Sequence, residues 1–257
     1  MSDSEIGMKQ ESVVKKGEER MGSYENKALE EAEAWRNKII RKSGMMNRMS
    51  KQAQIKLNGF IPEKAHGAIT ETFKNLIEGV LKGTHYLAKN KKEEAEMAFS
   101  EREEKVKKAI QLAQKTGMLE GAGTGAGGIF LGLADFPLLI VIKMKLLFEI
   151  AALYGFNANR YEERAFILYI FHLAFSSGEV KKEILDNILD WKEKNPPKEP
   201  DWRVLQQEYR DYIDIIKTFQ LVPGIGAAVG AYANRVLIAE LGETAMNCFR
   251  LRMLAKE

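Results

Sequence analysis

Five charged residues lie within or beside long apolar segments, and they are Asp135, Lys143, Glu149, Arg235 and Glu243. A charge removed from water needs a partner, so these residues are candidate contacts for an ion or a lipid headgroup. Asp135 is the most informative, because it interrupts an apolar block shortly before Pro137. Lys143, Arg164 or Arg235 could compensate its charge. An alternative makes Asp135 the cap of the helix that follows, placed just before its first turn.

Residues that typically carry metal or nucleophile chemistry are few. The one Glu-x-x-His motif, Glu63 to His66, lacks the second copy that a two-iron helical bundle requires. The sequence contains no HExxH, paired CxxC or G-x-S-x-G motif. Cys248 is predicted to be a small core residue. We therefore expect no catalytic residue, no metal and no cofactor.

Glycines recur four positions apart in two apolar segments, in the pairs Gly123 and Gly127, Gly128 and Gly132, and Gly226 and Gly230. Small residues at this spacing share one helical face and let two backbones approach closely. The string from Gly123 to Gly128 also matches the spacing of a dinucleotide fingerprint, but the residues before it have a helical pattern where that fingerprint needs a strand. We expect segments 121–132 and 224–234 to pack on each other. A membrane-inserting hairpin or a lipid-lined cleft is the open alternative.

The elements that position these residues are all predicted to be helices. Residues 1–22 are predicted to form a mobile tail, and Ser23 is placed to cap the first helix. The charged stretch 89–108 is predicted to be a solvated helix or hinge, with lipid headgroups or a partner protein as alternatives for its surface. Good helix formers predict a helix over 24–57, and apolar spacings of three and four predict helices over 62–87 and 202–221. Further helices are predicted over 161–177, 179–194 and 226–254.

The predicted fold class is therefore all-α: a helical bundle with two central glycine-rich apolar helices and no sheet, in a single domain over 23–257. The 39 Lys and Arg against 36 Asp and Glu give a net charge of only +3, without a basic block, so nucleic acid is not an expected partner. The single cysteine and the lack of an apolar leader predict a cytoplasmic protein. The apolar block 129–142 is shorter than the roughly 20 residues of a membrane span.

Several motifs together resemble the EcsC family over residues 49–254. They are Ala134-Asp135-Phe136-Pro137, the segment from Glu149 to Gly155, Gly224-Ile225-Gly226, the segment from Leu241 to Ala245, and Arg250-Leu251-Arg252. The resemblance implies a helical bacterial protein from a family named for a gene beside an ABC transporter, and it implies no catalytic residues. The positions that match the motifs are Asp135, Pro137, Glu149, Tyr154, Gly155, Glu243 and Arg252.

Two functional hypotheses from different classes follow. The first is a non-enzymatic, peripheral membrane-associated or lipid-binding protein on the inner face of the membrane, with a protein partner or a second copy of the chain as further candidate partners. The alternative is a hydrolase or metal-dependent enzyme that uses an acidic cleft around Asp135 and Glu149, together with His172.

Overall fold

The structure is a computed structural model, and it describes residues 22–46, parts of 71–79, 97–125, 129–191, 201–217 and 226–255. Within the helices, the side chains of 42–46, 120–125, 129–137, 210–217 and 226–230 lie outside the description, as do residues 1–21 of the predicted tail. All regular structure in the described ranges is helical, which confirms the all-α prediction. No described helix is both long and apolar enough to cross a bilayer.

The described helices overlap the predicted segments, and the first begins at Ser23, one residue before the predicted start at 24. Most of the helix predicted over 62–87 lies outside the described residues. In chain order they are α2 (Ser23–Met46), α6 (Phe99–Gly125), α7 (Ile129–Leu153), α8 (Tyr161–Phe175), α9 (Gly178–Leu189), α10 (Trp202–Lys217) and α11 (Gly226–Leu254).

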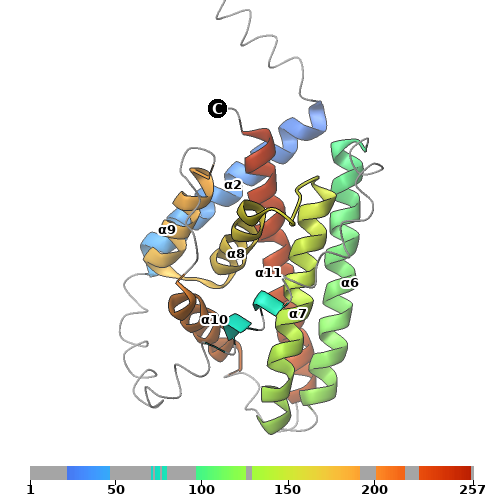
Figure 1. The fold of residues 1–257 in the computed structure, drawn as a ribbon, viewed down its shortest axis with the longest axis vertical. Coiled ribbons are helices and arrows are strands. Elements are labelled where there is room, and N and C mark those ends of the chain that lie inside the picture. The colour runs from blue at the N-terminus through green and yellow to red at the C-terminus, as the bar shows by residue number, and fades with distance from the viewer. Residues whose placement is uncertain are drawn as a thin grey trace, which may run out of the picture.

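Three long helices, α6, α7 and α11, run side by side along the long axis of the molecule (Figure 1). Each of the three contacts the other two, and α6 makes its most extensive contact with α11. The shorter α8, α9 and α10 lie to one side, and α2 packs against both α9 and α11. The glycine-rich ends of α6, α7 and α11 therefore lie together at one end of the long axis (Figure 1).

Helix α8 is buried around nearly its whole circumference, since apolar residues cover most of its face from Ala165 to Phe175. Aromatic side chains surround it: Phe166 lies 5.4 Å from Phe249 of α11 and 5.1 Å from Trp191, measured between ring centroids. Ring pairs at these separations contribute stability beyond the area that they bury. The central core is thus built on α8, with the second halves of α7 and α11 packed against it.

Specific backbone contacts end α7 and start α10. Gly155 has a φ of +88°, which only glycine adopts readily, and Phe156 N donates to Ala151 O at 2.9 Å in a Schellman motif. At α10, Asp201 Oδ1 accepts from the amides of Arg203 and Val204 at 3.0 and 3.1 Å, which caps the helix. These local signals fix where α7 turns toward α8 and where α10 begins.

Close backbone approach between α6 and α11 is found at Gly242. A Cβ atom on Gly242 would lie 2.7 Å from the Cδ1 and Cγ1 atoms of Ile110, so only glycine fits without movement of the Ile110 side chain. Nearer the glycine-rich end, Asn234 Nδ2 donates to Gly117 O at 3.1 Å across the same interface. The packing predicted for segments 121–132 and 224–234 falls on residues whose contacts lie outside the description.

The structure corrects one interpretation of Asp135. Helix α7 begins at Ile129 and continues without a break through Asp135 and Pro137. Asp135 therefore lies inside the helix and does not cap its first turn.

Candidate functional site

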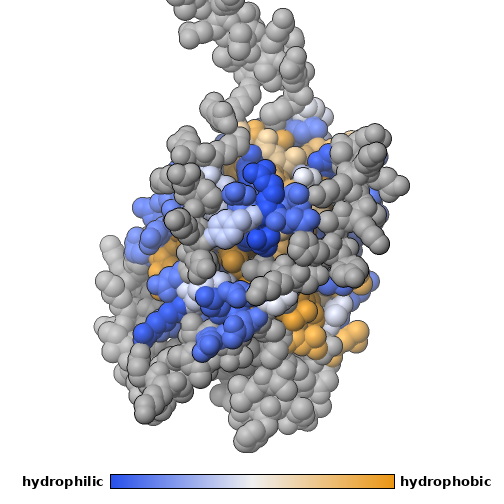
Figure 2. Space-filling view, in the orientation of Figure 1, coloured by the Kyte–Doolittle hydropathy of each residue, from blue (hydrophilic) through white to orange (hydrophobic). Residues whose placement is uncertain are grey.

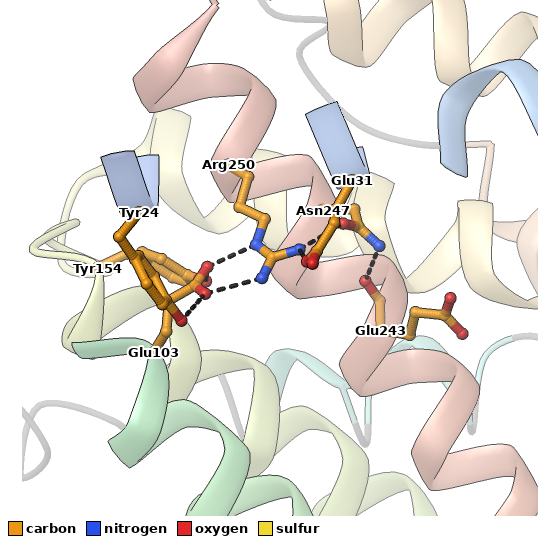
Figure 3. Close-up of polar contacts among 7 residues, drawn as sticks. All are labelled: Tyr24, Glu31, Glu103, Tyr154, Glu243, Asn247 and Arg250. Atoms are coloured by element: carbon orange, nitrogen blue, oxygen red, sulfur yellow. Dashed lines mark hydrogen bonds and ion pairs between the residues drawn. The ribbon is translucent and has the colours of Figure 1, made fainter. Parts of the chain in front are cut away.

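A buried polar cluster joins four helices at the end of the molecule opposite the glycine-rich segments. Glu103 of α6 is fully buried and forms two parallel bonds with Arg250 of α11: Nε donates to Oε1 at 2.5 Å and Nη2 donates to Oε2 at 2.7 Å. Tyr154 at the end of α7 donates to Oε1 at 3.0 Å, and Tyr24 of α2 donates to Oε2 at 2.9 Å. Figure 3 shows these side chains converging on one carboxylate.

Charges in the cluster stabilise each other. Burial alone would raise the pKa of Glu103, but the hydrogen bonds and the charge of Arg250 outweigh burial and hold this pKa below its ordinary value. Burial and the hydrogen bond to Glu103 together raise the pKa of Tyr24 to about 12, and they raise the pKa of Tyr154 as well. The carboxylate is therefore ionised at neutral pH, and both phenols stay protonated.

The acceptor positions of the Glu103 carboxylate are all occupied, and this limits its chemistry. A carboxylate has about four lone-pair positions, and here four donors occupy them. The remaining guanidinium nitrogen of Arg250, Nη1, donates to Glu31 Oε2 at 3.0 Å and to Asn247 Oδ1 at 3.3 Å. No acceptor position is left for a substrate proton, so the cluster joins helices and is not a catalytic base.

Sequence reasoning missed Glu103, because it lies in the charged stretch 89–108 that was predicted to be a solvated helix or hinge. The stretch is helical from Phe99, but Glu103 has no exposed surface. A signal was available: Glu103 shares one helical stripe with the buried residues Val106 and Ala109, at spacings of three. A charge on an apolar stripe indicates a buried pair.

A second ion pair links α8 to α11. Arg252 Nη1 and Nη2 donate to the two carboxylate oxygens of Glu163 at 2.6 and 2.9 Å. The guanidinium also lies 4.4 Å from the ring centroids of both Phe156 and Phe166, so it is held between two aromatic faces. Two of the residues that match the EcsC motifs, Tyr154 and Arg252, therefore serve buried polar contacts.

Among the candidate contacts whose side chains the structure describes, Lys143 is the most deeply buried. Its Nζ atom donates to Tyr209 Oη at 2.8 Å and lies 5.0 Å from the ring centroid of Phe175. Burial raises the pKa of Tyr209, which keeps its hydroxyl protonated. Lys143 thus faces α8 and α10, on the inner side of α7.

The other candidate contacts lie in different environments. Arg235 and Glu243 are exposed on α11, and Glu149 on α7 is half-buried. In Figure 3 the carboxylate of Glu243 points away from the polar cluster, while its backbone oxygen accepts a hydrogen bond from Asn247 Nδ2 at 3.0 Å. The side chain of Asp135 lies outside the described residues, so its contact with an ion or a headgroup stays a prediction.

Residues of metal or nucleophile chemistry do not gather in the described part of the chain. It contains no group of three or more His, Cys, Asp or Glu side chains that could hold a metal ion. His172 is buried on α8, its Nε2 atom has no hydrogen-bond partner among described residues, and burial lowers its pKa to about 4. Cys248 is buried, as predicted, and burial raises the pKa of its thiol.

Apolar side chains are exposed near the glycine-rich end of the long helices. Leu119 of α6 is 76% exposed, Leu138 of α7 is 42% exposed and Tyr232 of α11 is 66% exposed. We call these three residues the apolar ring. Figure 2 shows hydrophobic residues gathered on the lower right of one face, over α6 and α7.

Contacts between the helices place the ring residues at one height. Leu119 lies two residues beyond Gly117, and Tyr232 lies two residues before Asn234, so the hydrogen bond between Asn234 and Gly117 puts them level on antiparallel helices. The height of α7 relative to α6 is taken from Arg102 of α6, whose Nη1 atom donates to Tyr154 O at the end of α7 at 3.4 Å.

With a rise of about 1.5 Å per residue, Leu119 is about 26 Å along α6 from Arg102, and Leu138 is about 24 Å along α7 from Tyr154. The three residues of the apolar ring therefore lie at about the same level, near the glycine-rich end of the three helices.

Fold and side-chain contacts together define an all-helical protein whose long helices are joined by buried ion pairs at one end and expose apolar residues near the other. Comparison with known proteins gives this class a family. The chain belongs to the EcsC protein family, whose model matches residues 26–254.

Two relatives come from Bacillus subtilis (strain 168). The chain is 48% identical to Protein EcsC over 226 residues, which cover 88% of this chain and 94% of that protein. It is 32% identical to the uncharacterized protein YdbA over 141 residues, which cover 53% of this chain and 52% of that protein. No solved structure matches the chain.

Proposed function

We propose that this protein is a non-enzymatic, peripheral membrane-associated protein of the cytoplasmic face, and that it binds lipid through the apolar ring. The observation that carries the proposal is the exposure of Leu119, Leu138 and Tyr232 at one level of three packed helices. Scattered single apolar residues on a surface are ordinary, but a group at the end of packed helices is typical of an interaction site.

The shape of the exposed end favours shallow insertion. Amphipathic helical surfaces place their apolar residues about 5 to 10 Å into the boundary between headgroups and acyl chains, and they need no segment long enough to span the bilayer. The sequence beyond the ring is rich in glycine and apolar residues, from Gly121 to Leu133 and from Leu221 to Ala231. Within 120–137 and 218–231 the charged residues are Glu120 and Asp135 alone, so insertion at this end would carry few charges into the lipid.

Vesicle flotation of the full chain tests the proposal directly. We expect the protein to float with vesicles of mixed phosphatidylcholine and phosphatidylglycerol. Leu119→Gln and Leu138→Gln should each weaken binding about tenfold, since a leucine side chain transferred from water gains about 1 to 2 kcal/mol.

A matched control comes from Leu189 of α9, which is 39% exposed against 42% for Leu138 and lies away from the ring. Leu189→Gln should leave flotation unchanged. Protein that stays in the soluble fraction with every vesicle composition would refute the proposal.

A further inference from the structure

Charged residues follow the apolar ring in the same order on each of the three helices. Moving away from the ring, α6 carries Lys115, α7 carries Lys145 and α11 carries Arg235, and all three side chains are exposed. We call these residues the cationic band. None of them forms an ion pair with a described residue, unlike Lys108 farther along α6, which pairs with Glu104 at 2.8 Å.

Each cation lies on the same helical stripe as the ring residue of its own helix. Lys115 precedes Leu119 by four residues, Lys145 follows Leu138 by seven, and Arg235 follows Tyr232 by three. At about 1.5 Å per residue, the band lies about 5 to 11 Å from the ring along the helix axes.

On the side of the ring that faces the rest of the molecule, the described acidic side chains lie beyond the band. Among described side chains, the first acidic residues beyond the band are Glu104 on α6, Glu149 on α7 and Glu240 on α11. Glu120 and Asp135 lie on the other side of the ring, and their side chains are outside the description. On each helix the first exposed charge above the ring is thus a cation, and the described acidic residues lie beyond it.

We propose that the cationic band binds the phosphate groups of anionic phospholipids when the apolar ring enters the acyl boundary, so that this surface selects anionic membranes. The inference rests on the function proposed above and adds the class of lipid. The headgroup layer lies about one to two helical turns above the acyl boundary, which is the separation between ring and band. Glu104, Glu149 and Glu240 then stay in water, away from the negative surface.

The expected selectivity follows from three cations. Each Lys or Arg near an anionic surface strengthens binding about fivefold, so the band predicts about a hundredfold preference for vesicles with phosphatidylglycerol over pure phosphatidylcholine. The preference should shrink as salt is raised from 50 to 500 mM, because exposed charges are screened.

Flotation of the full chain against both vesicle compositions, with a charge-matched pair of variants, tests this inference. The band variant is Lys115→Gln, Lys145→Gln and Arg235→Gln together. The control variant carries Lys27→Gln, Lys38→Gln and Lys182→Gln, at exposed positions on α2 and α9, and it has the same net charge. Circular dichroism confirms folding of both variants.

If the band variant loses the preference for vesicles with phosphatidylglycerol and the control variant keeps it, the result supports the inference. Equal binding of the wild type to both vesicle types overturns the inference and leaves the proposed function standing. Equal loss in both variants also overturns it, because net charge and not this band would then control binding.

Binding to neither vesicle type overturns the proposed function and the inference with it. If such a protein also forms a dimer that Leu119→Gln dissociates, measured by light scattering, the ring belongs to a second copy of the chain.

Discussion

Glu103→Gln tests whether the buried ion pair holds the long helices together. The substitution keeps the size of the side chain and an oxygen that can accept from Tyr24 or Tyr154, but it removes the charge that faces Arg250. Arg250 is then buried, at 6% exposure, with only the carboxylate of Glu31 as an acidic partner, and that side chain is 51% exposed. A buried charge left without its partner destabilises a protein by about 3 to 5 kcal/mol. Because Glu31 compensates only weakly through solvent, we expect a loss of about 3 kcal/mol in the free energy of unfolding.

A double-mutant cycle separates the pair from its surroundings. Arg250→Gln should cost a similar amount, because it leaves Glu103 buried and ionised beside two phenols. Glu103→Gln combined with Arg250→Gln restores a neutral interior, so the double variant should be more stable than the sum of the two losses by about 2 kcal/mol or more. Urea unfolding followed by circular dichroism at pH 7 measures all three variants.

The difference in unfolding free energy between wild type and Glu103→Gln should depend on pH, which gives an independent check. The folded pKa of Glu103 lies below its unfolded value, so the stabilisation is complete above the unfolded pKa and is lost as pH falls through the folded pKa. The gap between wild type and Glu103→Gln should therefore be constant from pH 5 to pH 8 and should narrow below about pH 4.

Glu104→Gln is the control within the same helix, because Glu104 forms an exposed pair with Lys108. Exposed pairs contribute little, so this variant should unfold like the wild type. Single losses below about 1 kcal/mol, or a double variant equal to the sum of its parts, would show that Glu103 and Arg250 are not coupled.

Two further predictions concern buried positions elsewhere. His172 has a pKa of about 4 when folded against an ordinary 6.5, so the unfolded chain binds a proton first as pH falls and stability drops across that window. From pH 8 to pH 5 the free energy of unfolding should fall by about 2 kcal/mol because of His172, and urea titrations of His172→Phe should lack this contribution. If the free energies of unfolding of the variant and the wild type change with pH in parallel, the prediction is contradicted. Gly242→Ala should destabilise by about 1 to 3 kcal/mol, because the new methyl group overlaps Ile110, and Ile110→Ala in the same chain should recover part of the loss. Gly79→Ala, where a Cβ atom meets nothing within 4 Å, should instead stabilise by about 0.5 to 1 kcal/mol, and the opposite order of these two glycine variants in urea melts would refute the packing argument.

Helix positions could be predicted from the sequence because each helix is specified locally. The spacing of apolar residues predicted α8 and α10, and proline and glycine residues predicted where neighbouring helices end. The apolar residues from Ala165 to Phe175, interrupted only by His172, are typical of a buried helix, and α8 is one. Such signals act within one segment, so a single sequence contains them.

Contacts between distant residues were not predictable in the same way. Glu103 and Arg250 are 147 positions apart, and many acidic residues in the sequence could have been the partner of Arg250. The position of Glu103 on an apolar stripe indicated burial, but only the antiparallel packing of α6 on α11 determines which cation it meets. Likewise, Leu119 and Tyr232 have the types of core residues, and their exposure follows from the absence of a covering helix at that level among the described elements.

The two ends of the long helices therefore have different physical roles. Glu103 and Leu119 are about 24 Å apart along α6, so the cluster that joins α2, α6, α7 and α11 has no part in holding the apolar ring in place by direct contact. Exposed leucine and tyrosine side chains gain nothing from folding, because folding leaves them in water. Burial against a membrane, as proposed above, would supply the gain that folding does not, and the cations one to two turns away would match the charge of the headgroups at that position. The ion pairs stabilise the fold at one end, and the ring and band are left available for an interaction at the other.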